Sequence, residues 1–122
     1  MSKIVNRDTT VPEDHPFVTV FRHIRRDGPH HVGVGVAEWK QAPVGFDPDV
    51  VAEAHDVPEV HYVLSGTGVL YEEGEEFAVR AGDAIVTAAG RRHAMWATGT
   101  GPLVTIYVAT GLAAFEVTPP ET

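Results

Sequence analysis

The sequence predicts an all-β protein in which antiparallel strands form two packed sheets, as a barrel or a sandwich. About nine short runs of β-branched and aromatic residues follow one another closely, with turn residues between them. Twelve glycines and nine prolines, together with 43% hydrophobic residues, suit a sheet protein with many turns better than a helical bundle. No segment shows a convincing helical period, so we expect no helix longer than about two turns.

The chain has 122 residues, which is enough for one domain with a single core. We expect residues 17–117 to form this domain. Residues 1–16 are polar and contain Pro12 and Pro16, which predicts an arm with little regular structure. Residues 118–122 are expected to form a loose tail.

Alternation of side chains is clearest in residues 31–40. Three valines occupy one face of this strand, and Gly33, Gly35, Ala37 and Trp39 occupy the other. If the glycine face points into the barrel, the missing side chains leave room for a ligand; otherwise the glycines mark a bend or a bulge. The other expected strands are residues 17–24, 67–71, 76–80, 84–88, 93–97 and 103–109.

Residues 41–52 predict a long connection without a helix. Pro43, Gly45 and Pro48 interrupt any regular pattern, and residues 50–52 look like the start of a strand. Loops of this length in compact domains often serve as lids or rims of functional sites.

Composition limits the function. Seventeen acidic against nine basic residues give a net charge of −8, which argues against nucleic acid or an anionic membrane as a partner. Cysteine is absent, so a metal would have to be held by imidazole and carboxylate groups. No apolar run approaches the roughly 18 residues of a membrane span, and the first residues lack a secretory apolar region. A cytoplasmic location is therefore expected.

Four side chains that can bind metals or carry protons lie close together in the sequence: Glu53, His55, Glu59 and His61. If extended strands flank Pro58, alternation directs the side chains of Glu53 and His55 to one face of the first strand. It likewise directs those of Glu59 and His61 to one face of the second strand. Pro58 lacks an N–H group and favours a bend between the strands. The four groups would then converge on one side of a sheet, where a metal would need another ligand from elsewhere in the chain.

The same stretch resembles the first motif of the cupin superfamily, a group of small antiparallel barrels that often hold a metal. That motif reads His-x-His, three or four residues, Glu, six residues, Gly. Three residues separate His55 from Glu59, and six separate Glu59 from Gly66. Glu53 stands where the motif has its first histidine, which changes the first position of the ligand set that the resemblance implies.

A second stretch supplies the missing ligand. The second cupin motif reads Gly, five residues, Pro-x-Gly, two residues, His; Gly82, Gly90 and His93 fall in this register, with Ala88 in place of proline. The resemblance covers about residues 30–110 and implies a double-stranded β-helix, or jelly-roll barrel. It does not imply one chemistry, because this fold serves many unrelated functions.

The resemblance implies a divalent metal held by His55, Glu59 and His93, with Glu53 as a further ligand. Two imidazoles and one carboxylate leave coordination positions open and suit non-haem iron(II) that binds dioxygen and a substrate. A fourth ligand from Glu53 would also suit manganese, nickel or zinc. The alternative is a hydrogen-bonded cluster, or a set of solvated loop residues, without a metal.

His61 lies two residues beyond Glu59, on the same face and roughly 7 Å further along the strand. This distance is long for a shared metal and suits an acid or base in a pocket, because histidine titrates near neutral pH. A core histidine bonded to a neighbour is the alternative. Met95 and Tyr107 are expected to point inward with His93 and to line the pocket, with core packing alone as the favoured role of Met95.

Other polar residues carry weaker signals. Arg91 and Arg92 are expected at the pocket rim, where they would meet an anionic substrate, or else in a solvated turn. No Ser-His-Asp order, phosphate loop or dinucleotide fingerprint appears. Four histidines show no complementary spacing and are expected at the surface: His15, His23, His30 and His31.

These observations favour a metal-dependent enzyme acting on a small organic substrate, in particular a non-haem iron oxygenase, a dioxygenase-type oxidoreductase. One alternative is a metal-dependent lyase, cyclase or isomerase that uses His61 as acid or base. The others are a non-catalytic module that binds small molecules and a metal-free fold whose cluster is structural.

A homodimer is also expected. A barrel of this size leaves an outer sheet face open, and such surfaces are usually covered. The N-terminal strands would meet the partner, because they supply apolar residues near the chain start: Phe17, Val18, Val20 and Phe21.

Overall fold

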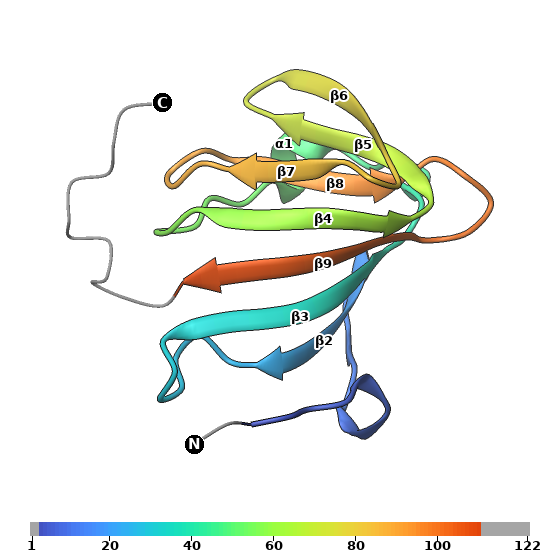
Figure 1. Cartoon of the computed structure of the whole chain (residues 1–122). Coiled ribbons are helices and arrows are strands. Elements are labelled where there is room, and N and C mark those ends of the chain that lie inside the picture. The colour runs from blue at the N-terminus through green and yellow to red at the C-terminus, as the bar shows by residue number, and fades with distance from the viewer. Residues whose placement is uncertain (1–2, 111–122) are drawn as a thin grey trace.

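Two antiparallel sheets form the structure, a computed structural model that describes residues 3–110 (Figure 1). The strands of the larger sheet follow the order β1 (Glu13–Asp14), β2 (Val18–Ile24), β3 (Val32–Trp39), β9 (Leu103–Thr110), β4 (Glu59–Ser65) and β7 (Ala84–Thr87). Those of the smaller sheet follow the order β6 (Glu75–Arg80), β5 (Thr67–Glu72) and β8 (His93–Ala97). The predicted all-β fold is confirmed. The expected tail, and the end of the expected domain beyond residue 110, lie outside the described residues.

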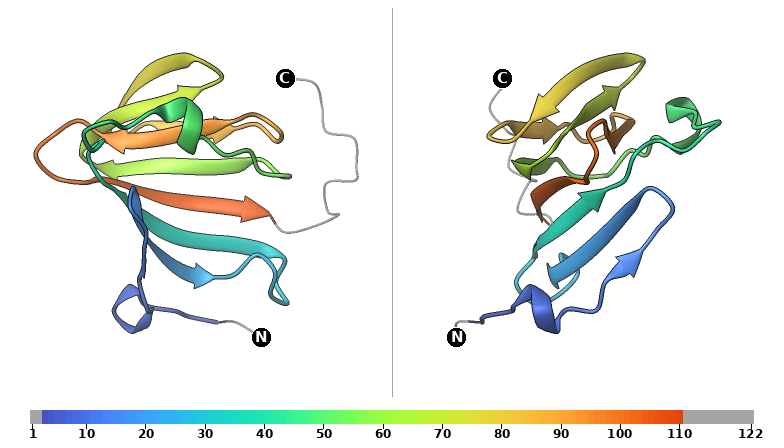
Figure 2. Two further views of the ribbon diagram at one scale, coloured as in Figure 1. Left: turned by 180° about the vertical axis from the view of Figure 1, so that it is seen from behind. Right: turned by 90° about the vertical axis from the view of Figure 1, so that its right-hand side faces the viewer.

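The expected arm contains two short elements in its described part, residues 3–16. A 3-10 helix (Arg7–Thr9) begins after Asn6, whose side chain accepts a hydrogen bond from the N–H group of Asp8 at 2.8 Å. Strand β1 then pairs with β2 and forms one edge of the larger sheet. Figures 1 and 2 show this edge at the opposite end of the structure from the β5–β6 hairpin.

The connection 41–52 contains a short helix, α1 (Pro48–Val51), which the sequence did not predict. The Asp47 side chain caps it by accepting a hydrogen bond from the N–H group of Asp49 at 2.9 Å, and Pro48 has the fixed φ that suits a first turn. One turn is too short for a 3.6-residue period to be visible. Within residues 3–110 no helix exceeds two turns, and none is long and apolar enough to cross a membrane.

Cross-strand pairing aligns inward-facing side chains in rows across the larger sheet, because directly paired residues point to the same face. One row consists of Arg22, Gly35, Tyr107, His61 and Ile85. The next row consists of Val20, Ala37, Thr105 and Val63, all buried. The main core between the sheets consists of Val63, Leu70, Val79, Ile85, Met95, Ala97 and Leu103. The first row therefore carries polar groups inward beside an apolar core.

The glycine face of β3 points inward, but protein atoms fill the space above Gly35. A Cβ atom there would lie 2.5 Å from the hydroxyl oxygen of Tyr107 and would collide with the carbonyl oxygen of Phe21. The β2 register also shifts beside this point, between Arg22 and Ile24. At Gly35 the room is thus used by Tyr107 and by the close approach of β2, and the interpretation of a ligand space is wrong.

Of the four apolar residues expected at a partner surface, one is buried and three are half-buried. Val20 is buried, Val18 packs against the core, and both line a cavity together with Phe17. The exposed large apolar side chains of this sheet lie instead on the outer face of β4, β7 and β9: Val60, Tyr62, Leu64, Val86 and Val108. The homodimer itself stays a prediction.

Candidate metal centre

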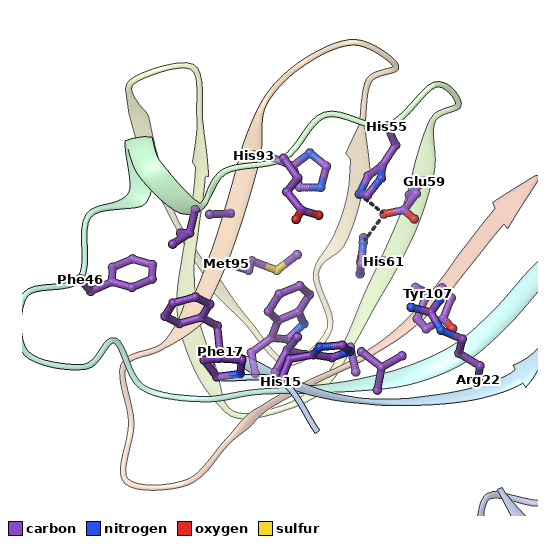
Figure 3. A pocket seen from close by; sticks show the side chains of 18 residues that line it. His15, Phe17, Arg22, Phe46, His55, Glu59, His61, His93, Met95 and Tyr107 are labelled. Atoms are coloured by element: carbon purple, nitrogen blue, oxygen red, sulfur yellow. Dashed lines mark hydrogen bonds and ion pairs between the residues drawn. The ribbon is translucent and has the colours of Figure 1, made fainter. Parts of the chain in front are cut away.

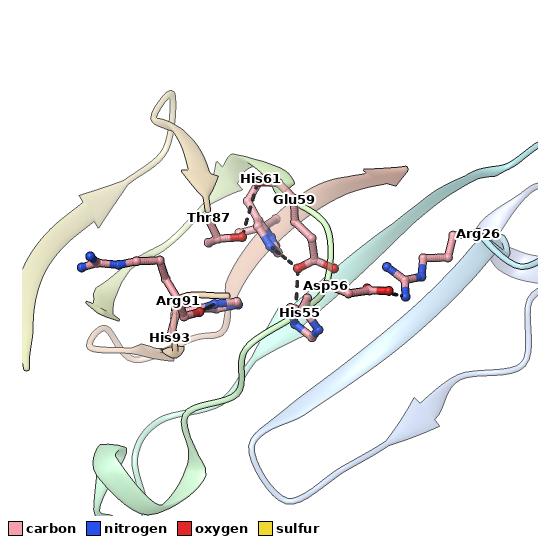
Figure 4. Close-up of polar contacts among 9 residues, drawn as sticks. Arg26, His55, Asp56, Glu59, His61, Thr87, Arg91 and His93 are labelled. Carbon is pink, nitrogen blue, oxygen red and sulfur yellow. Dashed lines mark hydrogen bonds and ion pairs between the residues drawn. The ribbon is translucent and has the colours of Figure 1, made fainter. Parts of the chain in front are cut away.

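His55, Glu59 and His93 come together where the two sheets meet. Each offers one ligand atom, and these atoms lie within 4.8 Å of one another. His55 lies in the loop before β4, Glu59 is the first residue of β4, and His93 is the first residue of β8 (Figure 4). The ring centroids of His55 and His93 are 5.1 Å apart. The fold therefore joins the two sequence motifs in one cluster.

Backbone hydrogen bonds hold the two motifs beside each other. Glu53 and His93 exchange both main-chain N–H···O bonds, each 3.0 Å long. The N–H group of Gly90 donates to the carbonyl oxygen of His55 at 2.8 Å. The Glu53 side chain lines the same cavity as the cluster but lies outside the group of three converging ligand atoms. Glu53 is thus a neighbour of the cluster in this geometry.

His93 is held in the form that a metal requires. Its Nδ1 atom lies 3.3 Å from the carbonyl oxygen of Arg91, and a carbonyl only accepts, so Nδ1 carries the proton and Nε2 keeps its lone pair. Metal-binding histidines commonly donate their other ring N–H in this way. Burial, and then the neighbouring His55, lower the pKa of His93 below its ordinary value, which favours the neutral ring.

Glu59 is held as a carboxylate. Burial alone would raise its pKa, but the hydrogen bond from His61 and the charges of His55, His61 and His93 together lower it. Its Oε1 atom lies 3.7 Å from Nε2 of His55 and 3.4 Å from Nε2 of His61 (Figure 3). An unprotonated carboxylate between imidazoles can serve as a metal ligand.

Hydrogen bonds hold both ring nitrogens of His61, which is 4% exposed. The Glu59 carboxylate only accepts, so Nε2 of His61 donates to it. Nδ1 then accepts from the hydroxyl of Thr105 at 3.3 Å, and the Thr105 oxygen accepts from Nε1 of Trp39 at 3.1 Å. His61 is therefore bonded to its neighbours, as a core histidine would be, and also lies in the wall of the cavity.

A cavity of about 470 Å³ opens in front of the cluster (Figure 3). Its volume falls in the range of sites for small organic molecules. Tyr107 lines it, as predicted, and Met95 both lines it and packs in the main core. Its apolar lining residues include Phe17, Val18, Trp39 and Phe46.

Two polar residues of the cavity wall, His15 and Arg22, do not follow from the sequence analysis. His15, expected at the surface, has a side chain that is 49% exposed but lines the cavity. Nothing in the sequence around His15 indicates this position. Arg22 also lines the cavity, and here a signal exists: it follows Val20 by two residues on the same strand, so alternation places both on one face.

The expected rim arginines lie elsewhere. Neither Arg91 nor Arg92 lines the cavity, so their interpretation as a site for an anionic substrate is wrong. The Arg91 side chain pairs with Glu72 at 3.1 Å, and the Arg92 side chain donates to the carbonyl oxygens of Asp49 and Ala52 at the end of α1. Both side chains thus tie the turn before β8 to its neighbours.

The residues present fit a bound divalent metal. The donor set consists of two imidazoles and one carboxylate, the hydrogen bond at Nδ1 of His93 leaves its Nε2 atom available, and the pKa of Glu59 is lowered. An open cavity lies on one side of the set. Such a set leaves coordination positions for other molecules.

The fold and the site together define a small jelly-roll barrel with a cluster able to hold a metal. The chain belongs to the cupin family, because the family model described as "Cupin domain" matches residues 43–109. Comparison with curated protein sequences gives no match.

Three solved structures illustrate the similarity. A predicted oxalate decarboxylase from Thermotoga maritima is 21% identical, with a TM-score of 0.72 over 90% of this chain and 100% of that one. An RmlC-like cupin from Shewanella frigidimarina is 15% identical, with a TM-score of 0.69 over 96% and 97%. The iron(II) form of HppE is 19% identical, with a TM-score of 0.69 over 88% of this chain and 60% of HppE. At these identities the similarity shows the fold alone.

Proposed function

We propose that this cupin is a metal-dependent enzyme acting on a small organic substrate, with a non-haem iron(II) site of the oxygenase type formed by His55, Glu59 and His93. One observation carries the proposal: the three ligand atoms lie within 4.8 Å of one another at the wall of a cavity of about 470 Å³. The similar fold of HppE, whose structure is known in an iron(II) form, supports the choice of metal. Glu53 would be a further, weaker ligand.

Bound there, iron(II) would supply a Lewis acid and a redox centre with positions open to dioxygen and substrate. The chain would contribute Nε2 of His93 and of His55 and the carboxylate of Glu59. The contact of His93 with the Arg91 carbonyl fixes which nitrogen faces the site. The apolar side chains of the wall, among them Trp39 and Met95, would orient the substrate and limit the access of water.

His61 would carry the proton of the reaction. Its Nε2 atom holds a proton 3.4 Å from Glu59, and its ring forms part of the cavity wall. The hydroxyl of Thr105 can donate to Nδ1 or accept from it, so it can accompany a change of tautomer. A positioned acid or base of this kind contributes roughly 10²–10⁴-fold to a rate.

The second candidate is a metal-dependent lyase, cyclase or isomerase on the same residues. The position of His61 favours it, because a proton carrier in the wall of a substrate cavity is what such reactions need. Dioxygen consumption separates the two candidates, since only an oxygenase requires it. A binding module would bind the small molecule and return it unchanged.

The test begins with elemental analysis of protein purified without added metal. The protein is then loaded with iron(II) under anaerobic conditions and screened for oxygen uptake with small organic substrates. We expect iron to bind to the wild type and to be lost in His93→Ala, and oxygen uptake to depend on bound iron. Equal metal content in the two proteins would contradict the proposed site, and turnover without oxygen uptake would favour the second candidate.

A further inference from the structure

A second polar region of the cavity lies away from the cluster of His55, Glu59 and His93. Arg22 on β2 and Tyr107 on β9 belong to the row of inward-facing residues that also contains Gly35 and His61. Three strand steps separate β2 from β4 in the sheet, which places the Arg22 backbone roughly 14 Å from that of His61. Figure 3 shows the side chains of Arg22 and Tyr107 side by side.

Gly35 brings the Tyr107 hydroxyl towards Arg22. The Tyr107 ring lies over β3 at Gly35, so close that a Cβ atom would be 2.6 Å from its Cε2 atom and 2.5 Å from its hydroxyl oxygen. Gly35 pairs with Arg22 on the next strand, so the ring reaches across β3 in the direction of the guanidinium group. Burial raises the pKa of Tyr107, although the charge of Arg22 and a hydrogen bond from Arg22 act in the opposite direction. The Tyr107 oxygen therefore accepts from Arg22, and the hydroxyl keeps its own proton to donate to a ligand.

Arg22 is the only arginine or lysine among the residues that line the cavity within the described part of the chain. Its Nε atom donates to Oε2 of Glu13 at 2.7 Å. Both side chains of this pair are substantially exposed, at 42% and 38%, and ion pairs between exposed groups contribute little to stability. Glu13 is therefore a weak partner with which the carboxylate of a ligand can compete, and its contact with Nε does not involve the two terminal nitrogens of the guanidinium group.

We infer that Arg22 and Tyr107 form a binding site for a carboxylate group of the substrate. A guanidinium group offers parallel N–H donors that match the two oxygens of a carboxylate, and the phenol adds a third donor. The cavity would then take a small organic acid whose carboxylate lies at Arg22 while the rest of the molecule extends towards His55, Glu59 and His93. This inference gives the substrate class of the proposed enzyme and rests on that function, but the binding step needs no metal.

The experiment uses the full-length protein without metal and measures the binding of succinate by titration calorimetry, with inorganic phosphate as a second probe. We expect the wild type to bind succinate, and Arg22→Ala to weaken binding by about tenfold or more, as expected for the loss of charge-assisted hydrogen bonds. Tyr107→Phe should weaken binding less, because it removes the donor and keeps the ring over Gly35. Glu13→Gln should strengthen binding, because it removes a carboxylate that competes for Arg22.

Arg25→Ala is the matched control, because Arg25 pairs with Asp27 and does not line the cavity; it should bind succinate like the wild type. Circular dichroism and thermal unfolding establish that each variant is folded. If Arg22→Ala is unstable, Arg22→Lys replaces it in the test, because lysine retains the positive charge and lacks the paired donors of a guanidinium group. Absent binding in the wild type, equal binding in Arg22→Ala, or binding of phosphate without succinate would overturn the inference. His93→Ala should still bind succinate, so loss of the metal and loss of the acid site are observed separately.

Discussion

The Nε2 atom of His61 lies 3.4 Å from the carboxylate oxygen Oε1 of Glu59. This contact joins a side chain able to carry a proton to one able to bind a metal. Because the hydrogen bond from His61 also lowers the pKa of Glu59, the two groups depend on each other in the absence of any metal. The contact also means that removing His61 tests two roles at once.

We expect His61→Ala to keep its metal and to lose activity by roughly 10²–10⁴-fold, as for the loss of a general acid or base. Metal content after dialysis and turnover of the loaded protein are the two measurements. If His61→Ala loses its metal as completely as His93→Ala, then His61 is a ligand and the role of proton carrier has no candidate.

The ligands should differ in their importance for metal binding. His93→Ala and His55→Ala should each lose most of the bound metal, because His93 is the one proposed ligand from the second motif and both belong to the converging cluster. Glu53→Ala should lose less, because Glu53 lies beside that cluster. His30→Ala, with an exposed histidine in the turn before β3, is the control and should keep the wild-type metal content.

Acidification should destabilise the metal-free protein in two stages. The folded protein lowers the pKa of His93 below 6.5, so the unfolded chain takes up this proton first and stability falls as the pH drops from 6.5 towards the folded pKa. The pKa of Glu59 is lowered below 4.5, so its contribution is present above 4.5 and is lost as the pH falls through the folded value. Urea unfolding at a series of pH values measures both stages, and His93→Ala should remove the first.

Metal affinity should also decrease as the pH falls. Imidazole and carboxylate ligands bind metals only when unprotonated, so affinity should decrease as the pH drops through about 6. Because the pKa of His93 is lowered, this ligand should remain available at a more acidic pH than an exposed histidine would. Titration of the metal at several pH values tests this, and an affinity independent of pH between 7 and 5 would contradict it.

Gly35→Ala should destabilise the protein by about 1–3 kcal/mol, the usual cost of inserting a methyl group into packed structure. The new Cβ atom would lie 2.5 Å from the Tyr107 hydroxyl and against the Phe21 carbonyl, a backbone atom that has little freedom to move. Gly101→Ala is the control, because a Cβ atom there would have no neighbour within 4 Å. Equal unfolding midpoints for the two variants would show that the atoms around Gly35 can move to accommodate a methyl group at little cost.

A homodimer is still expected, with a mass near twice the 13.2 kDa of one chain in light scattering. The apolar side chains on the outer face of β4 and β7 are 43–67% exposed, and clusters of this kind are usually covered. Val86→Lys, which places a charge in this face, should shift the equilibrium towards the monomer. A wild-type mass near 13.2 kDa at micromolar concentration would contradict the expectation.

Local alternation was sufficient to predict most strands, and the resemblance to the two cupin motifs implied the residues of the cluster. Alternation identifies strands because it depends on neighbours two residues apart. The spacings around Glu59 and before His93 lie within single turns and strands, so a short stretch of sequence determines each of them.

Other features depend on contacts between distant segments. The pairing of Arg22 with Tyr107 requires the register of three strands and the absence of a side chain at Gly35. The position of Arg92 depends on α1, a helix of one turn that leaves no periodic signal. The Phe17 side chain was assigned to the outside because apolar residues near a chain end do not reveal which face of a sheet they occupy.

The bridge between Glu53 and His93 consists of two peptide hydrogen bonds, and neither involves a side chain. The residue at position 53 can therefore change its chemistry while the backbone around the cluster keeps its shape. A substitution at this one residue can thus exchange a carboxylate for an imidazole beside the same backbone. We therefore expect that a substitution at position 53 would change the metal preference of the proposed site without a prior change in the fold.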